Sequence, residues 1–89
     1  MITNIYYSSR YKKDIKLCQR RHYDMEKLKE FIRILVSGSE LPQHYENHPL
    51  IGKWRGCFDA HIAPDWILIY ELSEDTLTLW RTGTHSDLF

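Results

Sequence analysis

Histidine and aspartate residues gather in the second half of the sequence, where their side chains can transfer protons or orient one another. Asp59 and His61 are two residues apart, so on a β-strand both side chains would project from the same face. Aspartate is disfavoured in strands, and a carboxylate beside an imidazole fixes the tautomer of the ring. His48 precedes this pair, and Asp65 and His85 follow it. We interpret these five residues as a candidate site for acid–base chemistry.

The segment 53–62 alternates between apolar and polar residues with a period of two, which predicts a half-buried strand. The face expected to pack on a core carries Trp54, Gly56, Phe58, Ala60 and Ile62. The other face carries Arg55, Cys57, Asp59 and His61. The candidate site would therefore lie on an open sheet face, as a shallow groove.

Two helices and three further strands are predicted to position this face. Residues 2–7 read as a short strand, and Ser8 or Ser9 can cap the helix that follows. Asp24 can cap a second helix, which Gly38 would end. Residues 40–52 are expected to form a loop. We expect strands at residues 66–72 and 76–82, and a tail at residues 84–89. The order β-α-α-β-β-β predicts an α+β fold with a helical hairpin on one face of a largely antiparallel sheet.

Length and composition predict one folded domain spanning residues 1–89, since 43% of the 89 residues are hydrophobic. The sequence has neither an apolar run long enough for a membrane span nor the pattern of a signal peptide, so we expect a cytoplasmic protein. Cys18 and Cys57 would then be reduced thiols. The net charge is zero, yet residues 1–36 carry +5 and residues 37–89 carry −5. Such a basic half either faces a polyanion or is simply solvated.

Several residues allow two readings from sequence alone. Arg81 can bind phosphate or pair with an acidic residue of the sheet, and Phe89 can pack inward or stack on a base. His44 and His48 are four residues apart, a spacing that suits a metal on a helix, but they lie in a proline-containing loop. We therefore expect no metal site.

The most specific stretches of the sequence resemble one known family, the YafQ branch of the RelE/ParE toxin superfamily. The resemblance covers nearly the whole chain and rests on the following residues: His48-Pro49-Leu50, Gly52, Trp54, Gly56, Asp59, His61, Pro64-Asp65-Trp66, Leu68-Ile69-Tyr70 and Arg81-Thr82-Gly83-Thr84-His85. It implies a RelE-like fold and a ribosome-dependent mRNA endonuclease, the toxin of a type II toxin-antitoxin pair. It also implies a monomeric toxin that a DinJ-like antitoxin holds inactive within a hetero-oligomer.

The resemblance also implies the site residues. The positions that the YafQ branch uses correspond to His48, Asp59, His61, Asp65, His85 and Phe89. The wider superfamily more often uses Arg, Lys and Tyr, so this chain agrees with the histidine-rich branch.

A mechanism without metal or cofactor follows as a hypothesis. The 2′-OH of the RNA attacks the adjacent phosphate, with His85 as general acid and His48 or His61 as general base. Arg81 would stabilise the phosphorane, and Asp59 and Asp65 would orient or charge the imidazoles. Ribosomal RNA would be contacted through its phosphates by Lys12, Lys13, Lys16 and Arg20.

Three other functions compete with this one. A ParE-like toxin of the same fold would bind a protein target such as gyrase without catalysis. A plain interaction module would add a partner's strand to its sheet edge. A metal-dependent hydrolase is the third, and clustered imidazoles favour catalysis over either binding role.

Overall fold

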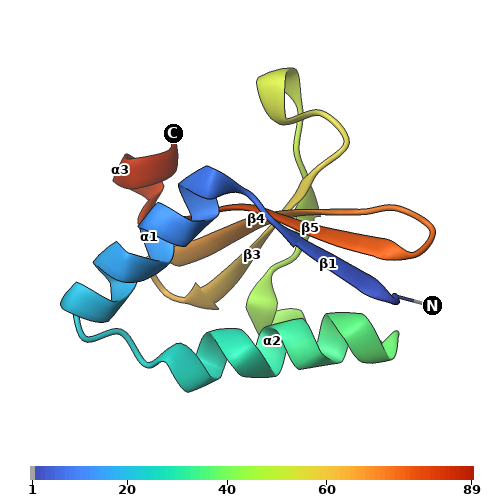
Figure 1. Ribbon diagram of the computed structural model, residues 1–89, viewed down its shortest axis with the longest axis horizontal. Helices are drawn as coiled ribbons and strands as arrows, with labels where there is room; N and C mark the ends of the chain where they lie inside the picture. Colours follow the sequence, from blue (N-terminus) through green and yellow to red (C-terminus); the bar gives the residue numbers. More distant parts are fainter. Residues whose placement is uncertain (1) are drawn as a thin grey trace.

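The computed structural model describes residues 2–89, and it arranges three helices around one sheet (Figure 1). The elements are β1 (Asn4–Tyr7), α1 (Ser9–Arg20), α2 (Met25–Ser37), β2 (His48–Pro49), β3 (Phe58–Ala63), β4 (Trp66–Leu72), β5 (Thr76–Gly83) and α3 (His85–Leu88). Short 3₁₀ turns occupy Gln43–Tyr45 and Gly52–Trp54. Within residues 2–89, none of the helices has the length and apolar character needed to cross a membrane.

The five strands form a single sheet in the order β1-β5-β4-β3-β2. Only β1 runs parallel to its neighbour, β5, and the other pairs are antiparallel. The predicted α+β class and the largely antiparallel sheet are confirmed. The expected loop 40–52 additionally contains β2, and the expected tail forms the short helix α3.

Both long helices begin where their capping residues predict, and α2 also ends where its glycine predicts. The hydroxyl of Ser8 accepts a hydrogen bond from the Tyr11 amide at 3.0 Å, and Asp24 caps α2 through the Glu26 amide at 3.2 Å. Gly38 ends α2 with a φ of 75°, the left-handed conformation that glycine adopts without strain. The short connection after α1 reverses the chain direction, as expected of a helical hairpin (Figure 1).

The main core lies between α2 and one face of the sheet. Phe31 of α2 is fully buried there against the aromatic rings of Tyr45 and Tyr70. Tyr11 and Cys18 bring α1 into the same core, where burial raises the pKa of the Cys18 thiol to about 11. Both cysteines are free and buried, in agreement with the expected reduced thiols.

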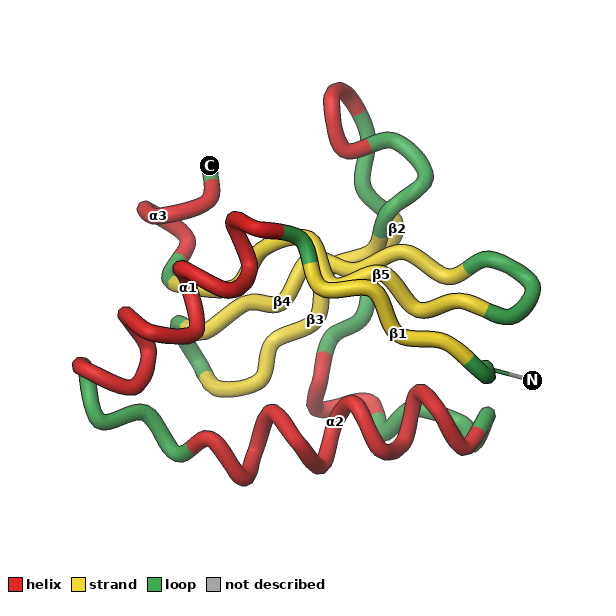
Figure 2. Tube along the Cα trace, in the orientation of Figure 1, coloured by secondary structure: helices red, strands yellow, loops and turns green. Residues whose placement is uncertain are grey.

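The predicted strand 53–62 begins five residues later than expected, at Phe58, and this moves Trp54 to the other face. Gly52 and Gly56 have φ values of 71° and 91°, which break the extended backbone and fold residues 52–54 into a turn. Figure 2 shows this turn raised on the side of the sheet opposite α2. The expectation that Trp54 shares a face with Phe58 is therefore wrong, although Phe58, Ala60 and Ile62 do face the main core.

A second, smaller apolar cluster covers part of the open face. Its buried members are Cys57, Ile67, Ile69 and Leu88, with Leu50, Trp54 and Trp80 packed around them. Leu88 belongs to α3, so this short helix is held on the face opposite α2 by its own apolar residue (Figure 1).

Candidate active site on the open sheet face

Asp59 and His61 lie on the face of the sheet opposite α2. Asp59 pairs with Ile69 and His61 with Ile67 across the β3–β4 ladder, and both isoleucines belong to the second cluster. Residues directly opposite in a ladder share a face, so both polar side chains point away from Phe58. This part of the predicted register is confirmed.

The Asp59 carboxylate lies within 4 Å of the His48 ring, and among residues 2–89 no such contact joins it to His61. The β2–β3 ladder places His48 directly opposite Asp59, with Nδ1 of His48 3.5 Å from Oδ1 of Asp59. The Asp59 side chain is only 14% exposed, whereas His48 is 62% exposed. Neighbours on the same face of one strand are about 6.6 Å apart, farther than directly paired residues on adjacent strands. The carboxylate therefore reaches across the sheet.

His61 has a different carboxylate neighbour, Glu46, whose Oε2 atom lies 3.8 Å from Nδ1 of the ring. Glu46 ends the Gln43–Tyr45 turn with a φ of 46°. The adjacent Asn47 accepts a hydrogen bond from the buried Tyr70 hydroxyl at 2.5 Å. This loop thus presents both Glu46 and His48 to β3. No pattern in the sequence marked Glu46 or Asn47 as part of the site.

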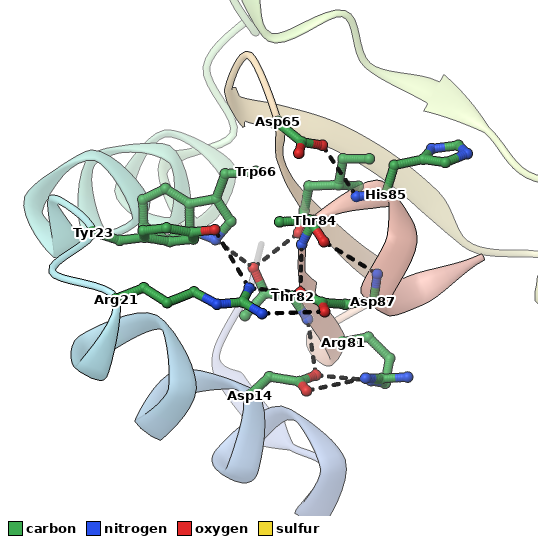
Figure 3. Close-up of polar contacts among 11 residues, drawn as sticks. Asp14, Arg21, Tyr23, Asp65, Trp66, Arg81, Thr82, Thr84, His85 and Asp87 are labelled. Carbon is green, nitrogen blue, oxygen red and sulfur yellow. Dashed lines mark hydrogen bonds and ion pairs between the residues drawn. The ribbon is translucent and has the colours of Figure 1, made fainter.

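His85 is positioned by the first turn of α3 (Figure 3). Thr84 and Asp87 form a reciprocal capping box, with the Thr84 amide donating to Asp87 at 2.9 Å and the Asp87 amide donating to the Thr84 hydroxyl at 3.1 Å. Asp65 accepts from the His85 backbone amide at 3.2 Å, so it fixes the helix start rather than the imidazole. The Phe89 ring lies 5.0 Å from the His85 ring and is 53% exposed. Phe89 therefore meets solvent beside His85 instead of packing inward.

An ion pair from Arg21, the residue directly after α1, anchors this turn, and it was not expected from the sequence. Arg21 donates to both carboxylate oxygens of Asp87, at 2.7 and 3.3 Å, and lies 3.4 Å from the Tyr23 hydroxyl (Figure 3). This guanidinium and the Thr84 amide hold the pKa of Asp87 well below its usual range. The residues are 66 positions apart, and no local spacing signals such a contact.

Arg81 forms a second anchor, with Asp14 of α1. Its guanidinium donates to the two Asp14 oxygens at 2.8 and 3.1 Å, and the Thr82 amide donates to Asp14 at 3.1 Å (Figure 3). The pair is nearly buried, and Asp14 raises the pKa of Arg81. Arg81 therefore pairs with an acidic residue, as one of the two sequence interpretations expected, but this residue lies on α1 and not in the sheet. Phosphate binding by Arg81 stays a prediction.

The four basic residues predicted to contact ribosomal RNA lie exposed on α1: Lys12, Lys13, Lys16 and Arg20. Across residues 2–89, none of the four forms an ion pair, so their charges are available to a polyanion. The same stretch of chain holds no group of three or more His, Cys, Asp or Glu side chains arranged to bind a metal ion.

Known proteins match this chain over all residues of the candidate site. A family model described as the bacterial toxin of type II toxin-antitoxin system, YafQ, matches residues 3–89. The mRNA interferase toxin YafQ of Escherichia coli (strain K12) is 52% identical over 87 residues, covering 97% of this chain and 95% of the relative.

Solved structures agree with this match. A chain in the crystal structure of the E. coli DinJ-YafQ toxin-antitoxin complex superposes with a TM-score of 0.92 at 50% identity, covering 100% of this chain and 99% of that one. A metal-bound toxin from Helicobacter pylori superposes with a TM-score of 0.90 at 33% identity, with full coverage of both chains. All elements that carry the candidate site therefore have counterparts in these relatives.

Proposed function

This chain belongs to the YafQ family of bacterial toxins of type II toxin-antitoxin systems, and from this premise we propose that it cleaves mRNA on the ribosome by histidine acid–base catalysis. As an mRNA interferase it is an endoribonuclease, and its partner is a cognate antitoxin, as in the E. coli DinJ-YafQ complex. To this activity our proposal adds three features: ribosome dependence, the histidine mechanism and independence of metal.

The observation that carries the mechanism is the placement of three histidines around one open sheet face. His48 and His61 each have a carboxylate within 4 Å, from Asp59 and Glu46 respectively. His85 stands on α3 at the end of the same face, beside the exposed ring of Phe89. RNA cleavage by its own 2′-OH needs one proton removed and another delivered, and imidazoles can do both near neutral pH.

In this mechanism each group has one task. His48 or His61, oriented by its carboxylate, takes the proton from the 2′-OH, and His85 donates a proton to the leaving 5′-oxygen. The Arg81 guanidinium, held by Asp14, offsets the charge that develops on the phosphorane. Phe89 seats a base beside His85. The exposed lysines and arginine of α1 bind ribosomal RNA through its phosphates.

The decisive experiment incubates the purified protein with programmed ribosomes and maps the mRNA ends. Products should end in a 2′,3′-cyclic phosphate or a 3′-phosphate, because the 2′-OH is the nucleophile. His85→Ala should lower cleavage about 10²–10⁴-fold, the range of general acid–base catalysis. His44→Ala, which changes an exposed histidine outside the site, should keep full activity.

One outcome in cells and in the cleavage assay would overturn this mechanism. If the wild type and His85→Ala arrest growth equally at equal expression, and neither cuts RNA, the chain acts as a non-catalytic ParE-like toxin on a protein target.

Metal independence has its own test, since a structurally similar toxin from H. pylori is metal-bound. Treatment with EDTA should leave cleavage unchanged. Loss of activity in EDTA that zinc restores, with the ribosomes shown to be intact, would instead assign a metal-dependent hydrolase.

A further inference from the structure

A hollow of about 470 Å³ opens on the same side of the sheet as the histidines, between β1, β5 and the turn Gly52–Trp54. Its wall combines aromatic rings with positive charge: Tyr6, Trp54 and Trp80, and Arg10, Lys53 and Arg81. Within the described residues 2–89, no acidic side chain lines it. The mechanism above uses only Arg81 of this set, so the other five residues have no assigned role.

One aromatic ring of the hollow is exposed to solvent, and a second is held in place by a hydrogen bond. The Tyr6 ring is 57% exposed and meets the Trp80 ring edge-on, at 6.5 Å between centroids. Trp80 is held by a hydrogen bond from its Nε1 to Glu71 at 3.0 Å. The ammonium group of Lys53 lies 5.8 Å from the centre of the Trp54 ring. A cationic hollow walled by rigid aromatic rings is the surface on which single-stranded nucleic acids stack their bases.

The sheet connects this hollow directly to the histidines. Arg81 pairs with Ile69, Ile69 with Asp59, and Asp59 with His48, which forms one row across four strands. At about 4.8 Å per strand, the row from Arg81 to His48 spans about 14 Å. A single RNA strand crossing the sheet along this row would have its scissile phosphate near the histidines and a neighbouring nucleotide at the hollow.

We propose that this hollow is a binding subsite for one nucleotide of single-stranded RNA, adjacent to the cleaved bond. The base stacks on the Tyr6 ring, and Arg10 and Lys53 bind the phosphates on either side. Stacking accepts any base, so the subsite supplies affinity and alignment but not sequence selection. This inference rests on the proposed function, since it assigns the substrate contacts of the same face.

The test uses the protein's own tryptophans as probes of RNA binding. Trp54 and Trp80 line the hollow, whereas Trp66 is only 3% exposed in the main core. A short single-stranded RNA with 2′-O-methyl riboses, which cannot be cleaved, should quench the fluorescence of the two hollow tryptophans. Tyr6→Ala should weaken binding about 5- to 100-fold, the range measured for base–aromatic stacking. Arg10→Gln and Lys53→Gln should each lower the salt dependence of binding by about 0.7 in log–log slope.

Tyr7→Ala is the matched control, because Tyr7 is the next residue of β1 and projects to the opposite face, beside Tyr11 of α1. It should bind the RNA like the wild type. The subsite is refuted if the RNA causes no quenching, if Tyr6→Ala binds normally, or if Tyr7→Ala loses as much affinity as Tyr6→Ala. Preference of the hollow for an acidic peptide over RNA would also refute it.

Failure of the subsite and failure of the proposed function give different results. If the protein cuts mRNA on programmed ribosomes but Tyr6→Ala changes neither RNA binding nor the KM for ribosomes, the proposed function is supported and the subsite is refuted. If Tyr6→Ala abolishes quenching but the wild type cuts no mRNA, the subsite stands and catalysis falls.

Discussion

Arg21 should control the activity of His85 although it lies directly after α1, far from the histidine in the sequence. Its guanidinium and the Asp87 carboxylate form the two-bond pair that holds the first turn of α3. The side chains are 33% and 25% exposed, so solvent screens them and the pair contributes little to the free energy of unfolding. Arg21→Ala should therefore lower the melting temperature by no more than about 4–8 °C, the largest shift expected from an exposed ion pair in a domain of this size.

The effect on catalysis should be larger than the effect on stability. Displacement of a catalytic group by about 1 Å can cost 10²-fold in rate. Without Arg21, α3 keeps its capping box but loses its tie to α1, so His85 and Phe89 are no longer held at one place. We expect kcat on programmed ribosomes to fall about 10- to 100-fold, with little change in KM. Arg21→Lys should recover only part of this loss, because an ammonium group cannot make the two parallel hydrogen bonds.

Arg33→Ala provides the matched control. Arg33 forms an exposed ion pair with Glu30 within α2, away from α3. It should cost a few tenths of a kcal/mol and leave kcat unchanged. An Arg21→Ala variant that is folded and fully active would show that His85 does not need this anchor. An equal fall in kcat for Arg33→Ala would show that the effect is a general loss of stability.

Three further predictions concern the same framework. Because the pKa of Asp87 is lowered in the folded state, its contribution to the free energy of unfolding is present above the ordinary carboxyl pKa of about 3.9 and is lost as the pH falls below it. The stability difference between wild type and Asp87→Asn in urea titrations should thus stay constant from about pH 7 to 5 and shrink in stronger acid; a loss already near pH 6 would contradict this sign. Gly83→Ala places a Cβ atom 2.8 Å from Oδ2 of Asp87, so it should displace α3 and lower both stability, by about 1–3 kcal/mol, and kcat. Gly38→Ala, which meets no neighbour but has a φ of 75°, should lower stability alone, and equal kcat losses in the two variants would refute the argument. Asp14→Asn leaves the nearly buried Arg81 charge without its partner and should cost about 3 kcal/mol in chemical denaturation, against less than about 0.5 for the exposed Glu74→Gln; equal costs would show that the pair is not structural.

Periodicity and capping residues were sufficient to predict the helices, most strands and the face on which Asp59 and His61 lie. Those signals are local, because a helix start or an alternating strand is written in adjacent residues. The start of β3 was missed because two glycines, Gly52 and Gly56, adopt positive φ values that the apolar alternation around them conceals. Composition cannot distinguish a glycine at a small core position from a glycine in a turn.

The sequence alone did not predict which side chains of the site pair with each other. Asp59 meets His48 and not His61 because the register between β2 and β3 decides which side chains face each other. Arg21 and Asp87 meet because α1 and α3 pack at one end of the sheet, and nothing at either position signals the other. Residue types therefore drew attention to histidines and aspartates that the fold brings to one face, while tertiary packing determines which of these side chains pair.

The parallel pairing of β1 with β5 has a consequence for the order in which the molecule can form. Asn4 pairs with Thr76, and the Ser8 hydroxyl that caps α1 also donates to the Trp80 carbonyl at 2.7 Å. The first strand thus has no neighbour until residues more than 70 positions later have left the ribosome. Forming contacts of such long sequence separation costs the entropy of closing a large loop, and this cost comes before the contacts stabilise the fold. A nascent chain should consequently acquire protease resistance in one late step, and the row from Arg81 to His48 assembles in that same step.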